Sequence, residues 1–96
     1  MRLNQFEIDS IKQITRRVFG DNSKVFLFGS RVDDNLRGGD IDLYIQSASR
    51  DDMYSKQVRF TNDLKITIGD QKIDVILGRD PERLIEQEAL LKGILL

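Results

Sequence analysis

Three aspartates interrupt apolar segments of the chain at positions where their carboxylates can act together. Asp40 and Asp42 flank Ile41 at the start of a segment with the composition of a β-strand. Side chains of a strand alternate between its faces, so both carboxylates lie on one face, with their Cα atoms about 6.5–7 Å apart. Asp74 interrupts the apolar run 73–77 in the same way. Carboxylates at this spacing suit two divalent ions about 3.5–4 Å apart, so Asp40, Asp42 and Asp74 are our candidate metal ligands and catalytic residues.

Taken singly, each of these aspartates is also explained as an ordinary solvent-facing position of a half-exposed sheet. Three acids on one sheet face repel one another unless cations neutralise them, which favours metal binding for the set. The chain has no cysteine and no histidine, so carboxylates are the only strong ligands left, and they prefer Mg²⁺ or Mn²⁺ to zinc. The same composition excludes disulfides and Ser–His or Cys–His nucleophilic pairs. Tyr44 lies on the carboxylate face of its strand, and we interpret it as structural.

A glycine and a serine follow the apolar run 25–28, where a buried strand passes into a helical turn. Free N–H groups and the positive end of a helix dipole at such a turn favour phosphate binding. Gly29 lets a phosphate approach the backbone, and the Ser30 hydroxyl adds a donor. Ser30 and Asp33 also have the spacing of a capping box, and the two roles of Ser30 can coexist. Arg31 is a candidate contact for a triphosphate, the alternative being an exposed arginine of the turn.

The elements that position these residues alternate along the chain. A capping box at Asn4 and Glu7, apolar residues at helical spacing and a stop at Gly20 predict a first helix. The helices are predicted at about 5–19, from a cap at Asp51-Asp52 to about 65, and from Pro81 to Gly93. The strands are predicted at 25–28, at 40–46 after Gly38-Gly39, at 73–77 and, as a short edge strand, at 94–95. This order predicts an α/β or α+β fold.

Size and charge restrict the kinds of partner that the chain can bind. Its 96 residues correspond to a single domain, 1–96, and a domain of this size buries only about 60–65% of its unfolded surface, so we expect an open groove as the active site. The formal charge of −1 falls short of the basic surface that binds long nucleic acid. No apolar stretch has the length of a signal peptide or a membrane span, so we expect a cytoplasmic protein without membrane contact.

Together these features resemble a known enzyme superfamily. Gly29-Ser30, nine intervening residues, Asp40-Ile41-Asp42-Leu43 and a later Asp74 resemble the signature of the DNA polymerase β-like nucleotidyltransferases. Phe-Gly-Ser-Arg at 28–31 and the ending at 88–95 are similar to the minimal nucleotidyltransferase branch of that superfamily. The resemblance spans nearly the whole chain. It implies a polymerase β-like fold, with a small mixed β-sheet and helices packed on one side.

The resemblance also implies a role for each candidate residue. The Gly-Ser segment with Ser30 holds the β and γ phosphates of an NTP. Asp40 and Asp42 bind both of two Mg²⁺ ions, and Asp74 binds the catalytic ion next to the acceptor oxygen. Gly39, a further candidate for contacting the nucleotide, stands where this branch commonly has serine. The missing hydroxyl bears on nucleotide affinity and rate rather than on the class of reaction.

Many members of the branch are antitoxins encoded beside a HEPN-domain ribonuclease toxin, and some attach AMP from ATP to a tyrosine of that toxin. The resemblance therefore implies a protein adenylyltransferase that uses ATP and acts on a HEPN-type partner. The chain lacks the helical second domain with which larger relatives hold their acceptor, so a second copy or another protein must supply that surface. The alternative is a catalytically weak module that neutralises a partner by docking.

The last seven residues carry more large apolar side chains than a short strand can bury. They are Leu90, Leu91, Ile94, Leu95 and Leu96. We expect a homo- or hetero-oligomer in which this segment contributes to the contact. The alternative is a chain end that docks onto its own core.

Overall fold

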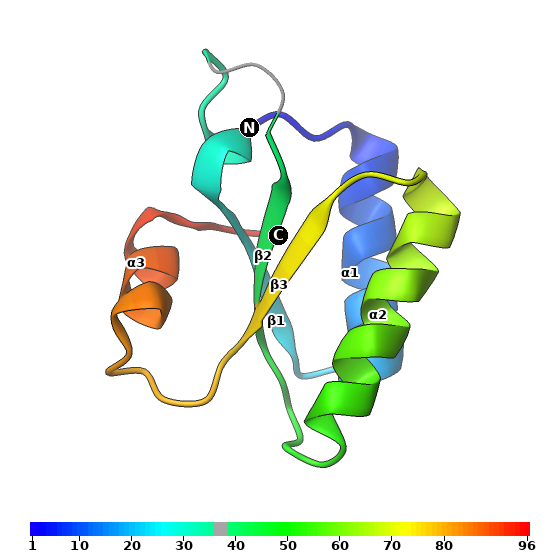
Figure 1. Cartoon of the computed structure of the whole chain (residues 1–96), viewed down its shortest axis with the longest axis vertical. Coiled ribbons are helices and arrows are strands. Elements are labelled where there is room, and N and C mark those ends of the chain that lie inside the picture. Colours follow the sequence, from blue (N-terminus) through cyan, green and yellow to red (C-terminus); the bar gives the residue numbers. More distant parts are fainter. Residues whose placement is uncertain (36–38) are drawn as a thin grey trace.

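The computed structural model describes residues 1–35 and 39–96, and its centre is a four-stranded sheet (Figure 1). The strands are β1 (Lys24–Phe28), β2 (Ile41–Gln46), β3 (Ile73–Leu77) and β4 (Ile94–Leu95), in the order β3-β2-β1-β4. β1 is antiparallel to both β2 and β4, whereas β2 and β3 are parallel. The predicted strands, including the short one at the C-terminal end, are confirmed. Gly38, expected just before β2, lies outside the described residues.

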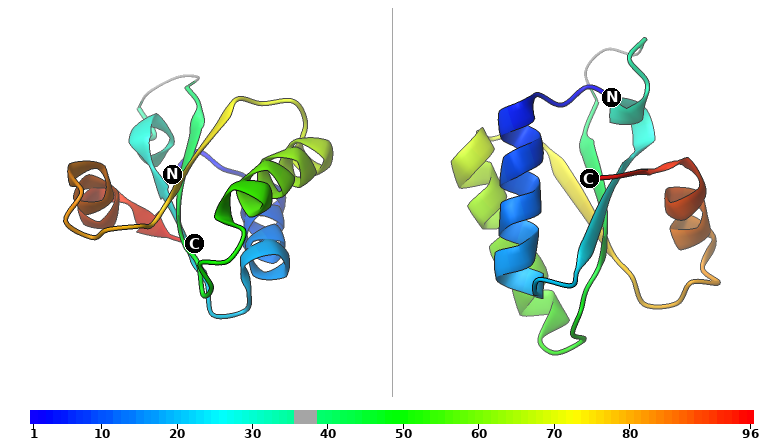
Figure 2. Two further views of the ribbon diagram at one scale, coloured as in Figure 1. Left: turned by 60° about the horizontal axis from the view of Figure 1, so that its bottom comes forward. Right: turned by 180° about the vertical axis from the view of Figure 1, so that it is seen from behind.

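Two helices cover one face of the sheet. They are α1 (Gln5–Phe19) and α2 (Met53–Ile68), and they pack side by side (Figure 2). The capping box predicted for α1 is confirmed, because the backbone N–H of Glu7 donates to Asn4 Oδ1 at 2.7 Å and that of Asn4 donates to Glu7 Oε1 at 3.0 Å. The core lies between these helices and the inner sheet face, and it consists of Ile11, Ile14, Val18, Phe19, Val25, Leu27, Ile41, Leu43, Ile45, Phe60, Leu64 and Ile73.

The ends of α2 differ from the sequence prediction. Asp52 occupies the N-cap position, but its φ of 52° is left-handed and its side chain makes no capping hydrogen bond, so the predicted side-chain cap is wrong. The first turn closes instead through the backbone, where Lys56 N donates to Asp52 O at 2.9 Å. The helix continues to Ile68 because the stop is Gly69, whose φ of 100° is accessible mainly to glycine.

The third helix, α3 (Leu84–Lys92), packs against the opposite face of the sheet (Figure 2). The fold class is confirmed, and the expectation of helices on one side holds for α1 and α2 but not for α3. The prediction that this helix begins at Pro81 is wrong, because α3 begins at Leu84. Asp80 Oδ1 accepts the N–H of Glu82 at 2.9 Å and Asp80 O accepts that of Arg83 at 3.0 Å, which holds 80–83 in turns before the helix starts.

A buried carboxylate, Glu86, attaches α3 to the sheet. It is only 1% exposed and accepts the hydroxyl of Tyr44 at 2.8 Å, the backbone N–H of Asp80 at 2.9 Å and Arg83 Nη1 at 3.1 Å. Burial alone would raise the pKa of Glu86, but the backbone N–H groups of Asp80 and Arg79, the Tyr44 hydroxyl and Arg83 outweigh it and hold the pKa below the usual 4.5. Tyr44, itself 1% exposed, is therefore structural, as expected.

The apolar C-terminal segment is divided between the core and the surface. Leu96 N donates to Val25 O at 2.9 Å and its side chain packs against the core, while Leu91 is 83% exposed and Leu95 is 55% exposed. None of the helices in the described part of the chain is long and apolar enough to span a bilayer.

Candidate active site

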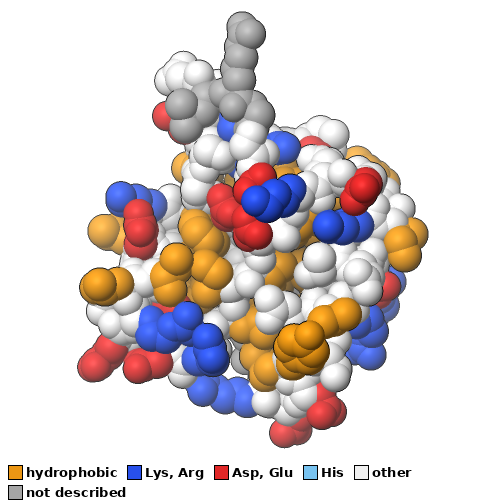
Figure 3. Space-filling model, viewed as in Figure 1, with side chains coloured by type: hydrophobic (Ala, Val, Ile, Leu, Met, Phe, Trp, Pro, Cys, Tyr) orange, Lys and Arg blue, Asp and Glu red, His pale blue; other side chains and the backbone are white. Residues whose placement is uncertain are grey.

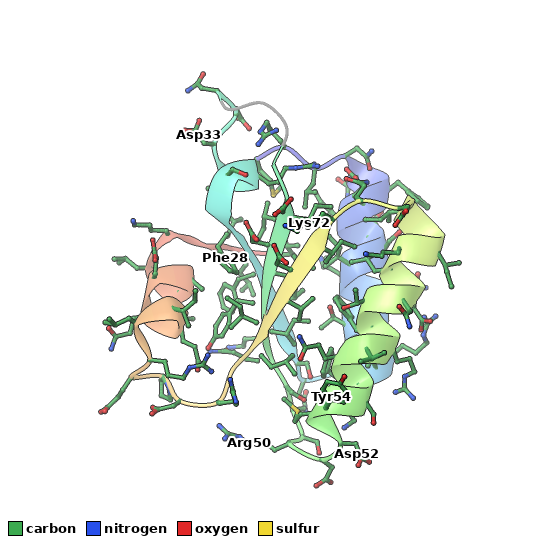
Figure 4. The ribbon with its side chains drawn as sticks, in the orientation of Figure 1. Phe28, Asp33, Arg50, Asp52, Tyr54 and Lys72 are labelled. Atoms are coloured by element: carbon green, nitrogen blue, oxygen red, sulfur yellow. The ribbon has the colours of Figure 1, made fainter. Side chains whose placement is uncertain are left out.

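The parallel pairing of β2 and β3 brings the predicted aspartates together. Asp42 and Asp74 are direct partners in the register of the two strands, so their Cα atoms are separated by about one strand spacing, roughly 4.8 Å. Asp40 immediately precedes β2. The carboxylates gather on the face seen in Figure 3, next to a basic side chain, and Figure 4 labels Lys72 at this place.

The electrostatics of the cluster centre on Asp42, which is half-buried. Burial, the negative charges of Asp74 and Asp40, and a hydrogen bond with Asp74 all raise the pKa of Asp42, and Lys72 opposes them. Lys72 Nζ lies 3.3 Å from Asp40 Oδ2, and the hydrogen bond and negative charge of Asp40 raise the pKa of Lys72. Among the residues that the structure describes, the site thus holds an excess of negative charge, which the exposed Lys72 partly compensates.

Sequence reasoning did not identify Lys72. The sequence shows only that a lysine stands directly before the strand that contains Asp74, and a lysine at such a position is also typical of an ordinary exposed surface. Its role depends on the parallel register, because that register places the start of β3 beside Asp40 at the start of β2.

Within residues 1–35 and 39–96, no three acidic side chains are already arranged around a common point as metal ligands. Asp40 is turned toward Lys72 instead. The donor set nevertheless fits a divalent cation, because carboxylate oxygens are hard ligands. A cation would also relieve the repulsion by Asp74 and Asp40, which adds to burial in raising the pKa of Asp42. The residues that would hold such a cation are Asp40, Asp42 and Asp74.

Gly29 brings the backbone of the phosphate-loop candidate against this cluster. It begins the 3₁₀ helix η1 (Gly29–Val32), directly after Phe28, which pairs with Asp42 in the β1–β2 register. Its φ is 74°, and a Cβ added there would lie 3.0 Å from Asp42 Cγ and closer still to Asp42 Oδ2. Only glycine fits this position, both in conformation and in space.

The surroundings of Ser30 differ from a capping box. Asp33 Oδ1 accepts the N–H of Asn35 at 2.8 Å, the N–H of Asp33 donates to the backbone oxygen of Ser30 at 3.2 Å, and η1 has no side-chain cap. The predicted Ser30–Asp33 box is therefore wrong. The Ser30 side chain lies against Gly39 instead, whose φ is 88°, and a Cβ added to Gly39 would come within 3.2 Å of Ser30 Cβ and nearer to its Oγ. Glycine at position 39 thus leaves room for the Ser30 hydroxyl.

Arg31 connects the segments around the site. Its Nε donates to Gly39 O at 3.2 Å, Nη1 to Arg2 O at 3.0 Å and Nη2 to Gln71 Oε1 at 3.1 Å. Arg2 also donates, from Nη2 to Ser30 O at 3.0 Å. These bonds give Arg31 a structural role in holding the segments before β2 and β3 against η1, and its contact with a triphosphate stays a prediction.

A pocket of about 320 Å³ opens beside Gly29, between η1 and α3. Phe28 and Val32 supply apolar walls, and Glu88 and Lys92 of α3 line the other side. Figure 4 places Phe28 between the sheet and α3. The sequence did not predict this pocket, because α3 reaches this face of the sheet through the buried Glu86 contact.

Comparison with protein families matches residues 9–96 to the family described as polymerase beta, nucleotidyltransferase. A search of curated proteins finds no match. The matched region contains all four strands and every residue of the carboxylate cluster and the Gly-Ser segment. The superfamily expected from the sequence is confirmed, while its minimal branch and the pairing with a toxin stay predictions. The chain belongs to the polymerase β nucleotidyltransferase family.

Proposed function

We propose that this protein transfers a nucleotide, AMP from ATP, to a hydroxyl group of a partner protein, using Mg²⁺. The observation that carries the proposal is the convergence of two features on Asp42. Asp74 is the direct partner of Asp42 on the neighbouring strand, and the Gly29 backbone lies next to the carboxylate of Asp42. A carboxylate pair against a glycine-containing turn is suited to hold an NTP and its cations together.

The chain's own residues supply binding and orientation. The Gly29 backbone admits the phosphates, and the Ser30 hydroxyl, placed over Gly39, adds a donor. Asp40 would help to hold a cation, and Lys72, 72% exposed and 3.3 Å from Asp40 Oδ2, would then be available to the negatively charged phosphates. The pocket between η1 and α3 offers Phe28 as an apolar surface for the nucleoside.

In the reaction, the acceptor hydroxyl oxygen forms a bond to the α phosphorus while the bond from that phosphorus to the bridging oxygen breaks, and pyrophosphate leaves. Asp40, Asp42 and Asp74 would hold the divalent cations, whose charge would lower the pKa of the hydroxyl and stabilise the leaving group. The hydroxyl proton passes to a carboxylate oxygen of Asp74 or to solvent. Asp74 suits this role because it is exposed and lies beside Asp42, and the chain has no histidine.

We propose a tyrosine of a HEPN-type toxin as the acceptor, with this chain as antitoxin. The resemblance of Phe28-Gly29-Ser30-Arg31 and of the ending at 88–95 to the minimal nucleotidyltransferase branch supports this assignment.

The test is incubation with NTPs labelled at the α phosphate, with Mg²⁺ and the protein encoded by the neighbouring gene. We expect label from ATP on a tyrosine of that protein, none in EDTA, and a loss of orders of magnitude in Asp42→Asn and Asp74→Asn. Asp63→Asn is the matched control, since Asp63 pairs with Arg17 on the surface at 3.0 Å. Full transfer in EDTA would rule out the proposal, and partner binding without turnover would favour a docking module.

A further inference from the structure

β3 is an edge strand of the sheet, and its outer edge begins beside the carboxylate cluster. In the described part of the chain β3 pairs with β2 alone. Lys72 O accepts Ile41 N at 3.0 Å and Gly78 N donates to Ile45 O at 2.8 Å, so the backbone groups just before and just after β3 face β2. Alternate residues of a parallel strand face opposite sides. The backbone groups of Val75 and Leu77 therefore point outward, and Val75 O is reached there by Gln57 Nε2 at 3.1 Å.

A groove of about 420 Å³ runs along this edge. On one side it is lined by Met53 and Tyr54 of α2, and Tyr54 is 81% exposed. Arg79 and Arg83 line it beyond the end of the strand. Figure 3, in which β3 faces the viewer as in Figure 1, shows apolar and basic side chains gathered below the acidic cluster. No strand of the described residues covers this edge, and the Gln57 side chain, which lines the groove and reaches Val75 O, would have to give way to a pairing backbone. A strand edge with apolar and cationic walls has the chemistry to bind an extended acidic peptide.

The groove and the cluster share one strand. From Asp74 to Leu77 the distance along β3 is about 10 Å, at roughly 3.3 Å per residue. A segment that pairs with this edge places one residue directly opposite Asp74, with its side chain on the same sheet face. Under the proposed function, that position is next to the acceptor oxygen.

We propose that the acceptor is an extended segment of a partner protein that adds to the sheet along β3. This inference rests on the proposed function and names the form in which its substrate is bound. The acceptor hydroxyl belongs to the residue opposite Asp74. Residues opposite Val75 and Leu77 are apolar and point toward Met53 and Tyr54 of α2.

The residue of the segment opposite Ile76 is acidic. Ile76 shares its sheet face with Tyr44, its partner in the β2–β3 register, and the Tyr44 hydroxyl donates to Glu86 on that face. Arg83, 3.1 Å from the buried Glu86 and 33% exposed, lies at the same face. Along β3 from Asp74 to Leu77, the four residues of the bound segment are therefore a hydroxyl-bearing, an apolar, an acidic and an apolar residue.

The probe is a pair of fluorescent peptides, each roughly ten residues long, with Tyr-Val-Glu-Val at the centre of one and Val-Glu-Val-Tyr at the centre of the other. They cover the parallel and antiparallel directions. Binding is followed by fluorescence anisotropy and by backbone amide exchange in NMR spectra, without NTP or cation. We expect one peptide to bind and to slow the exchange of the Val75 and Leu77 N–H groups.

Two variants test the contacts. Arg79→Glu should weaken binding about three- to tenfold, as expected for reversal of an exposed charge, whereas Arg16→Glu, on the exposed side of α1, should leave it unchanged. Val75→Pro removes an N–H that points away from β2, so it should weaken binding while the sheet persists. If Val75→Pro unfolds, as shown by circular dichroism, Arg79→Glu and the exchange data still decide the matter.

Several outcomes would overturn the inference. They are the absence of binding, binding that leaves Val75 and Leu77 exchange unchanged, and a dimer whose β3 amides are protected without peptide, which would assign the edge to a second copy. With ATP and Mg²⁺, the bound peptide should be labelled on its tyrosine, and a phenylalanine version should bind equally without label. A partner that is labelled while β3 stays unprotected would overturn this inference and leave the proposed function intact. Peptide binding with no transfer either to the peptide or to the protein encoded by the neighbouring gene would support this inference and refute the proposed function instead.

Discussion

Replacing Asp42 by asparagine should make the metal-free protein more stable, although Asp42 is central to the proposed chemistry. Asp42 lies opposite Asp74 in the strand register, and burial and the charges of Asp74 and Asp40 disfavour its ionised form. Like charges directly opposite one another in a sheet destabilise it by up to about 1 kcal/mol. Asparagine keeps the size and hydrogen-bonding ability of the side chain while removing one of these charges.

For a domain of this size, 1 kcal/mol corresponds to a rise of roughly 4–8 °C in Tm. The assay is thermal unfolding by circular dichroism at neutral pH in EDTA. The increase should persist at 0.1 M salt, where the screening length is about 10 Å, and shrink toward 1 M, where it is about 3 Å. Adding Mg²⁺ should then raise the Tm of the wild type more than that of Asp42→Asn.

The matched control is Asp63→Asn, which breaks a surface pair with Arg17. This change should alter stability by no more than about 0.5 kcal/mol, and not in the stabilising direction. A Tm of Asp42→Asn in EDTA that is equal to or lower than that of the wild type would contradict this expectation, because it would show that repulsion between the carboxylates does not destabilise the folded state.

Three further predictions follow from individual contacts. Gly39→Ala should lower the free energy of unfolding by at least about 1–2 kcal/mol, because the φ of 88° is strained for an L residue and the new Cβ meets Ser30. Denaturant unfolding should show a smaller loss when the same change is made in a Ser30→Gly variant, and equal losses would contradict the contact between the two residues. Ser30→Ala should lower NTP affinity with little loss of stability, since η1 has no side-chain cap, and equal nucleotide binding by folded variant and wild type in a titration would contradict the phosphate role. Glu86→Gln should destabilise by at least about 2 kcal/mol at neutral pH, against almost no change for the exposed Glu88→Gln. Because the pKa of Glu86 is lowered from 4.5 in the folded state, its ionised form stabilises the protein above that pH, and this stabilisation is lost as the pH falls through the folded pKa. The difference in unfolding free energy between wild type and Glu86→Gln, measured by urea unfolding, should therefore narrow in acid. A difference independent of pH would contradict the stabilising role of the ionised Glu86.

The parts of the fold that local patterns determine were predicted from the sequence. The helical spacing and capping box of α1 and the alternation of Asp42 with buried neighbours in β2 depend only on residues close in the chain. The same alternation identified Asp74. The pairing of Asp42 with Asp74 needed the parallel register of β2 and β3, which no local pattern contains.

Other features could not be predicted because they depend on distant contacts. Glu86 reads as an ordinary helix-surface acid, and only the Tyr44 hydroxyl and the Asp80 N–H explain its burial and the position of α3. Gly39 was interpreted as the loss of a hydroxyl. The structure gives a steric reason instead, since the Ser30 side chain lies where a Cβ of residue 39 would be.

Whether the three aspartates hold the cations of a bound nucleotide would be seen directly in a crystal structure with Mn²⁺ and an ATP analogue that cannot be cleaved between the α and β phosphates. The data would be recorded so that manganese gives an anomalous signal. We expect two manganese peaks about 3.5–4 Å apart, both held by Asp40 and Asp42 and one of them also by Asp74, with the β and γ phosphates against Gly29 and Ser30. Manganese bound away from these carboxylates would contradict the proposed site. So would a nucleotide bound elsewhere while Lys72 stays paired with Asp40.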